Sequence, residues 1–129
     1  MNAINVSSIP ENGVIEIFLG AKYEGYIGLV DISMPCIDVK RTVLSISCDQ
    51  VDSTCFNRKR ILRRVHIDNS AGYQYIQFQN IMYYKLDSSD YKLTIRLFDD
   101  RGPLKFKLAE PVLMTINLQH EHPKHWLNV

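Results

Sequence analysis

The chain has 129 residues, of which 46% are hydrophobic and 22% are charged, and its formal net charge at pH 7 is +1. This length fits one domain that can bury an apolar core, and the composition excludes an intrinsically disordered chain. The small net charge excludes a global attraction to nucleic acid or to anionic lipid, so either role would require a local patch.

Residues 1–12 are polar, include Pro10 and end at the turn signal Asn12-Gly13, so the sequence predicts a flexible N-terminal arm here. After this arm, short segments alternate apolar and polar side chains and are rich in β-branched and aromatic residues, which favours strands. In the first half of the chain the predicted strands span residues 14–19, 25–34, 42–48 and 61–67.

The second half of the chain continues the same pattern. Turn signals interrupt it at residues 68–72 and 99–103, and the second turn makes residues 104–108 the returning arm of a hairpin. A polar, irregular C-terminal tail is predicted for residues 119–129. The other predicted strands span residues 73–79, 81–86, 91–98 and 112–118.

About eight or nine short strands, turn signals about every 8–12 residues and the lack of a convincing helix predict an all-β fold. We expect residues 13–118 to form a single jelly-roll or β-sandwich domain of about eight antiparallel strands. No internal repeat, low-complexity tract or interdomain linker divides the chain.

The three cysteines, Cys36, Cys48 and Cys55, lack the paired spacing of a disulfide framework or a zinc finger. Cys48 and Cys55 flank a short polar connection and can in principle meet, but free thiols in a reducing compartment are the simpler interpretation. Cys48 is expected to be a small core residue. The first residues do not resemble a signal peptide, and no stretch approaches the roughly 20 apolar residues of a membrane span. We therefore expect synthesis in the cytoplasm or nucleus and no membrane contact.

No combination of residues predicts catalysis. A phosphate-binding loop, a dinucleotide fingerprint and a nucleophile elbow are all absent from the sequence. The adjacent carboxylates Asp99 and Asp100 lie in a predicted tight turn, where successive side chains diverge. His120, His122 and His125 are the best candidates for a zinc or nickel site, but a polar tail beside a proline favours incidental histidines. We expect a protein without enzymatic activity, cofactor or metal.

The basic run from Arg58 to Arg64 concentrates five of the fifteen cations in seven residues. It has three interpretations: a weak, non-specific contact with nucleic acid, an ion-pairing surface for a neighbouring subunit, or an edge strand that charge protects from unwanted pairing. Arg63 shares the apolar phase of Ile61 and Val65, which indicates that its side chain meets a partner on assembly. The candidate residues of this run are Arg58, Lys59, Arg60, Arg63 and Arg64.

Seven tyrosines are many for a chain of this length, and Tyr83-Tyr84 follow closely on Tyr73 and Tyr75. Tyrosine suits protein interfaces because it combines apolar area with a hydrogen-bonding tip, but a core can hold it equally well. Tyr83 and Tyr84 therefore join the basic residues as interaction candidates.

Several segments, taken in order, resemble a family of jelly-roll capsid proteins encoded by Polinton (Maverick) elements and adintoviruses. Gly28 to Pro35 is similar to a "G-L-x-E/D-I-x-x-P" strand of that family, and Val43 to Asp49 to the next strand, which ends in Cys-Asp. Arg60 to Val65 resembles a Leu-Leu-Arg segment, and Tyr83 to Leu86 a strand that precedes the best-marked motif. That motif is the most specific likeness: Leu93 to Gly102, with Phe106 and residues 112–118, resembles an "I-x-I-x-D-D-x-G … F … V-x-L-x-L" ending.

The resemblance implies a penton-type or minor capsid subunit of an icosahedral double-stranded DNA virus, or of a virus-derived element. Such a subunit would form a homopentamer at the capsid vertex, bind the major capsid protein and reside in the virion. The connection between the strands that end at Pro35 and Cys48 is shorter than in the family, which fits a minimal subunit or a captured copy with a new function.

Two functions of other classes remain as alternatives. One is a trimeric attachment or carbohydrate-binding knob, in which exposed tyrosines such as Tyr83 stack on sugar rings. The other is an enzyme that uses a metal held by the three histidines of the tail. In the capsid hypothesis, the candidate assembly elements are the basic run and the arm of residues 1–12.

Overall fold

The computed structural model of the chain describes residues 2–37, 41–53, 58–68, 73–87 and 91–121. Over these ranges the chain forms ten β-strands and no helix, and all strand pairs are antiparallel. The predicted all-β class is therefore confirmed. Within the described ranges there is no helix that is both long and apolar enough to cross a membrane.

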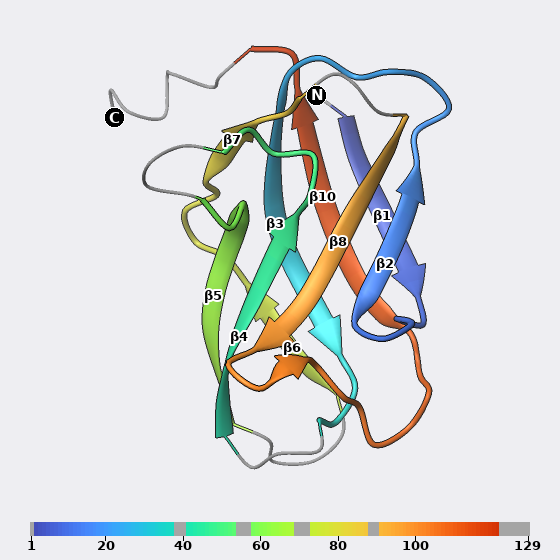
Figure 1. Cartoon of the computed structure of the whole chain (residues 1–129), viewed down its shortest axis with the longest axis vertical. Coiled ribbons are helices and arrows are strands. Elements are labelled where there is room, and N and C mark those ends of the chain that lie inside the picture. The colour runs from blue at the N-terminus through green and yellow to red at the C-terminus, as the bar shows by residue number, and fades with distance from the viewer. Residues whose placement is uncertain (1, 38–40, 54–57, 69–72, 88–90, 122–129) are drawn as a thin grey trace.

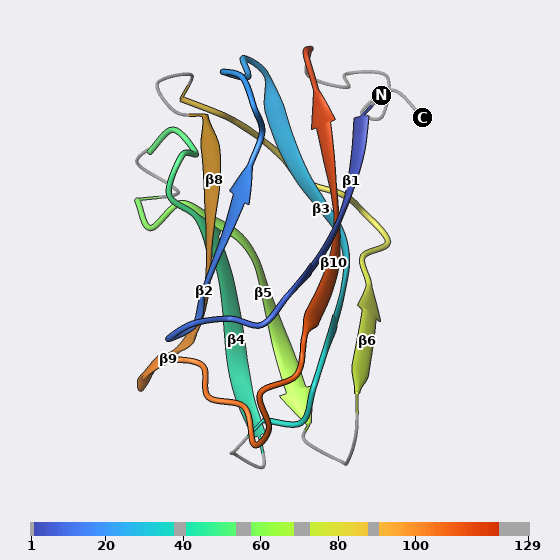
Figure 2. The same cartoon turned by 90° about the vertical axis from the view of Figure 1, so that its right-hand side faces the viewer.

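The strands form two sheets that lie face to face as a sandwich (Figures 1 and 2). Sheet A has the order β1 (Asn2–Ser8), β10 (Val112–Gln119), β3 (Tyr26–Met34) and β6 (Gln74–Gln77), with β7 (Tyr83–Lys85) also paired to β3. Sheet B has the order β2 (Val14–Phe18), β8 (Lys92–Asp99), β4 (Arg41–Cys48) and β5 (Ile61–Asp68), and the short β9 (Gly102–Pro103) pairs with β8.

One apolar core fills the space between the two sheets. Because side chains alternate across a strand, every second residue of a central strand points inward. In β4 these residues are Leu44, Ile46 and Cys48, and all three are fully buried. In β10 the inward residues are Val112, Met114, Ile116 and Leu118. The alternation in the sequence thus located the core.

The prediction of a flexible arm over residues 1–12 was wrong, because β1 pairs with β10 along its whole length. Its inward residues Ile4 and Val6 pack against the core, whereas its outward residues are small or polar. The turn signal at Asn12-Gly13 was correct. Both residues have positive φ, and Glu11 and Val14 exchange two backbone hydrogen bonds of 3.0 Å across them.

The expected hairpin arm at residues 104–108 is shorter in the structure. After the turn, the returning strand consists of Gly102–Pro103 alone. One further backbone hydrogen bond joins the Leu104 N–H to the Leu97 carbonyl at 2.9 Å. Pro103 lacks an N–H and so cannot extend a regular ladder. The chain then crosses to a single bridge between Phe106 and Ile37.

The two faces of β4 allow a matched test of the core. Ile46 is fully buried, whereas Val43 on the opposite face is 42% exposed. We expect Ile46→Ala to lower the free energy of unfolding by about 2–5 kcal/mol, because it leaves a cavity, and Val43→Ala to change it by about 0.5 kcal/mol or less. Equilibrium urea unfolding measures both, and equal effects would contradict this placement of the core.

Candidate interaction surface

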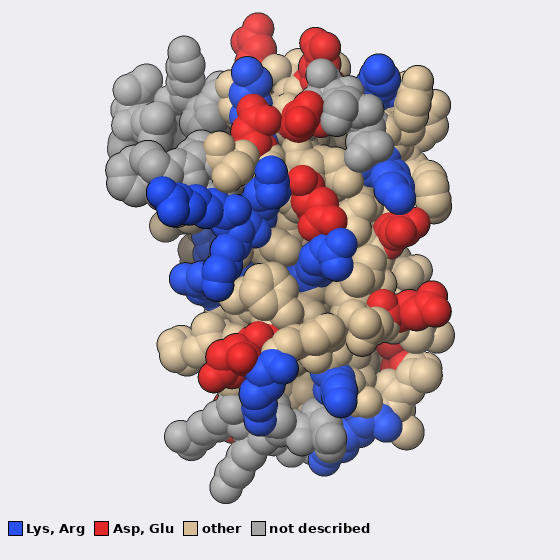
Figure 3. All heavy atoms as spheres, in the orientation of Figure 1, with Lys and Arg blue, Asp and Glu red and all other residues tan. Residues whose placement is uncertain are grey.

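The basic run leads into β5, which forms one edge of sheet B. Arg58 and Lys59 lie exposed in the turn before β5, and Arg64 projects from its outer face. Figure 3 shows Lys and Arg side chains gathered on this side of the molecule. Within the described parts of the chain, no carboxylate forms an ion pair with Arg58, Lys59 or Arg64.

Arg60 and Arg63, in contrast, have partners within the chain. Arg60 has a positive φ of 56°, and its Nε donates to the Val51 carbonyl at 2.8 Å. The guanidinium of Arg63 lies 4.3 Å from the centre of the Phe78 ring and donates to the Asn80 carbonyl at 2.9 Å. Its position in the apolar phase of β5 therefore has an explanation inside one copy: Arg63 attaches the connection between β6 and β7 to sheet B.

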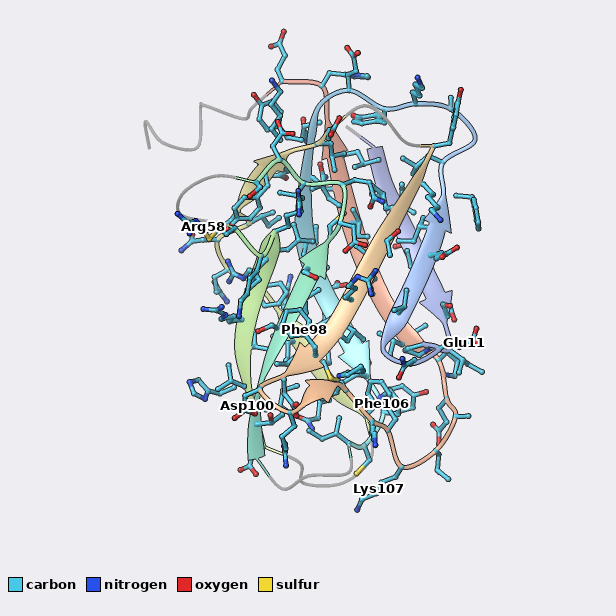
Figure 4. The ribbon with its side chains drawn as sticks, viewed as in Figure 1. Glu11, Arg58, Phe98, Asp100, Phe106 and Lys107 are labelled. Atoms are coloured by element: carbon cyan, nitrogen blue, oxygen red, sulfur yellow. The ribbon has the colours of Figure 1, made fainter. Side chains whose placement is uncertain are left out.

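An open groove of about 610 Å³ adjoins the unpaired cations on the outer face of sheet B. Lys59 and Arg64 line it from the side of β5, and Val43 and Phe98 contribute apolar surface from β4 and β8. Figure 4 shows Phe98 on this face of the sandwich. Asp100 and Arg101, in the turn after β8, also line the groove. The groove thus combines free positive charge, apolar side chains and one exposed acid, without a cluster suited to catalysis among the residues that line it.

Asp99, which also lines the groove, is a structural residue. Its two carboxylate oxygens accept hydrogen bonds from the Arg101 amide at 2.8 Å, the Thr42 hydroxyl at 3.1 Å and the Arg101 guanidinium at 3.1 Å. Burial alone would raise the pKa of Asp99, but these bonds outweigh burial and hold the pKa below its usual value. As expected for a tight turn, the two side chains diverge. Asp99 accepts hydrogen bonds within the turn, whereas Asp100 is exposed to solvent.

Two polar contacts that the sequence did not reveal fix the connection after β4 against β8. Asp49 accepts from Arg96 through both carboxylate oxygens, with N–O distances of 2.8, 2.9 and 3.1 Å. The side chain of Gln50 accepts from the Thr94 amide at 2.7 Å and donates to the Thr94 hydroxyl at 3.2 Å. No local pattern marks these pairs, because 47 and 44 residues separate their members.

Tyr83 and Tyr84 belong to sheet A, so the structure does not bring them together with the basic run in one site. They pair with Gly28 and Ile27 of β3. The Tyr83 ring occupies the space above Gly28, where a Cβ atom would lie 2.8 Å from the ring. Burial raises the pKa of Tyr83, partly offset by its hydrogen bond with Gln119. Tyr84 packs against the core.

The remaining candidates fall into the core or outside the described residues. Cys48 is fully buried, as expected for a core residue, and burial raises the pKa of its thiol to about 11. His122, His125 and Cys55 lie outside the described residues, while the His120 ring stacks on Tyr23 with centroids 4.9 Å apart. In the ranges that the structure describes, no three His, Cys, Asp or Glu side chains are arranged to hold a metal ion.

Models of known protein families match no part of the chain, and no curated protein sequence matches it. A functional assignment therefore depends on the strand order, on the exposed surfaces and on the short motifs in the sequence. Of these surfaces, the β5 side of sheet B combines a groove with three exposed cations, Arg58, Lys59 and Arg64, that have no ion pair in the described part of the chain.

Asp99 gives the stability of the sandwich a specific dependence on pH. Since its folded pKa is lowered, its contribution is present above the unfolded pKa of about 3.9 and is lost as the pH falls through the folded pKa. We expect Asp99→Asn to cost about 1–3 kcal/mol at pH 7 and less below pH of about 4, measured by urea unfolding across pH. Asp100→Asn, in the same turn, is the control. An equal cost for both variants, or a constant cost at all pH values, would contradict this role.

Proposed function

We propose that the sandwich is a jelly roll, because its strand pairs are nested. If β6 and β7 count as two parts of one strand and β9 as part of a turn, β1 pairs with β10, β2 with β8, β3 with β6 and β7, and β4 with β5. These are the pairs of one long folded hairpin. Two further contacts, β10 with β3 and β8 with β4, wrap that hairpin into two sheets. Eight strands wrapped in this way form a jelly roll.

We further propose that the protein is a structural capsid subunit of the penton or minor type. The nested strand pairs are the single observation that carries this proposal, because the jelly roll is a recurrent fold of viral capsid proteins. The resembling motifs support it, since they fall in order on β3, β4, β5 and the β8–β9 turn. The most specific of them, Asp99 to Gly102, is the turn that Asp99 stabilises.

In this function the protein performs no chemistry and acts by contact alone. Copies of the chain would associate with each other and with a major capsid protein through the sides and end loops of the sandwich. The segment of residues 1–12 contributes to the fold itself, because β1 completes sheet A. Its deletion would therefore remove an edge strand rather than a detachable assembly arm.

One observation favours a carbohydrate-binding knob as a second candidate. Tyr75 is 62% exposed on sheet A, and its hydroxyl donates to the Asp31 carboxylate at 3.1 Å. An exposed ring beside a carboxylate is a suitable platform for a sugar. Tyr83, the residue named for this function from the sequence, is less suitable because its ring lies over Gly28.

Native mass spectrometry of the purified chain, at low and at moderate salt, tests the capsid proposal. We expect a complex of five copies of the 15.0 kDa chain, with a smaller fraction assembled at moderate salt because charged side chains contribute to the contact. A trimer would instead favour the attachment knob. A monomer at every concentration and salt tested would contradict self-assembly.

A further inference from the structure

The two ends of sheet B carry charge of opposite sign. Residues 9–20, which include β2, contain two carboxylates, Glu11 and Glu16, and no Lys or Arg. Residues 58–64, at the start of β5, contain five cations and no carboxylate. Along the sequence these two segments therefore carry opposite charge, and in the fold Lys92 of the neighbouring β8 pairs with Glu16 and reduces the negative charge on the β2 side.

The topology keeps these two sides apart. In the order β2-β8-β4-β5 the acidic and basic strands are the first and the last, and Figure 4 shows Glu11 and Arg58 on opposite sides of the sandwich. Three steps of about 4.8 Å between strands separate β2 from β5 by roughly 14 Å. This exceeds the Debye length of about 8 Å at physiological ionic strength, so the two sides do not neutralise each other within one copy.

Both sides have side chains available for a partner. Among the residues that the structure describes, Glu16 forms one weak ion pair, to Lys92 at 3.7 Å, and both side chains are more than one-third exposed. Phe18 shares the outward phase of β2 with Glu16 and is 75% exposed, the highest value among the large apolar side chains that the structure describes. On the basic side, Arg58, Lys59 and Arg64 are exposed, whereas Arg60 and Arg63 are held by contacts within the chain.

We infer that the acidic side of one copy, formed by Glu11, Glu16 and Phe18, docks on the basic side of a second copy, formed by Arg58, Lys59 and Arg64. The inference rests on the proposed function and names the surfaces through which the subunit assembles. Because the two surfaces differ, the contact is head-to-tail, and each copy keeps one free surface of each kind. Repetition of such a contact closes into a ring when the rotation between neighbours permits closure.

A second copy fits the basic side better than nucleic acid does. Only three cations of the run are free, which is few for a non-specific contact that depends on neutralised phosphates. The complementary acidic surface, in contrast, is present on every copy of the same chain.

Charge reversal on each side tests this contact. The acid-side variant carries Glu11→Lys and Glu16→Lys, and the base-side variant carries Arg58→Glu, Lys59→Glu and Arg64→Glu. We expect either variant alone to associate at least about tenfold more weakly than the wild type, because like charges then face each other. A single chain with all five substitutions has both signs reversed and should assemble again. Native mass spectrometry measures all three, and thermal unfolding confirms that each is folded.

The control is Lys107→Glu, which reverses an exposed charge that belongs to neither side and should leave assembly unchanged. Normal assembly of both single-side variants, or failure of the five-substitution chain to regain it while folded, would overturn the head-to-tail contact but leave the capsid proposal intact. A loss caused by the base-side variant alone would also overturn it, because a head-to-tail contact depends on both sides equally. A wild-type chain that never assembles contradicts the proposed function itself.

Discussion

The inward side chains of sheets A and B meet in one apolar layer, and this packing determines which parts of the protein can bind a partner. The central strands contribute fully buried residues such as Ile32, Ile46 and Ile116, so the space between the sheets is occupied. Each strand that faces this layer must present its alternate residues outward. Function is therefore expected on the outer faces and at the edges of the sheets.

The outer surfaces are not equivalent. Sheet A presents the exposed ring of Tyr75 beside Asp31, and the Tyr83 ring covers Gly28. Sheet B carries polar links that fix its shape, the Asp49–Arg96 pair and the Asp99 turn, beside a groove with unpaired cations. Its two edges differ in charge, which gives the sandwich a direction from β2 to β5. A subunit with such a direction is suited to repeated contact between copies.

The sequence predicted the sandwich because most strands have one buried face and the alternation is clear, as in residues 42–48. It failed for β1, since the outward residues Ala3, Asn5 and Ser7 are small or polar and Pro10 suggested a loose segment.

For the candidate surface, the sequence located the basic run. It could not show which of these cations bind within the chain and which remain exposed. Arg63 was recognised as an inward residue, yet its partners Phe78 and Asn80 follow from the path of the chain between β6 and β7. The contacts of Gln50 and Asp49 with β8 likewise depend on strand pairing, which alternation does not specify.

The central claim is that copies of this chain meet through the two ends of sheet B, and amide hydrogen exchange at increasing protein concentration tests it most directly. We expect slower exchange in two segments, Val14–Phe18 and residues 58–68, because their open edges become covered as copies associate. The exposed outer residues of β6 should exchange at the same rate at all concentrations. Slower exchange confined to sheet A, with no change in β2 or β5, would contradict the claim.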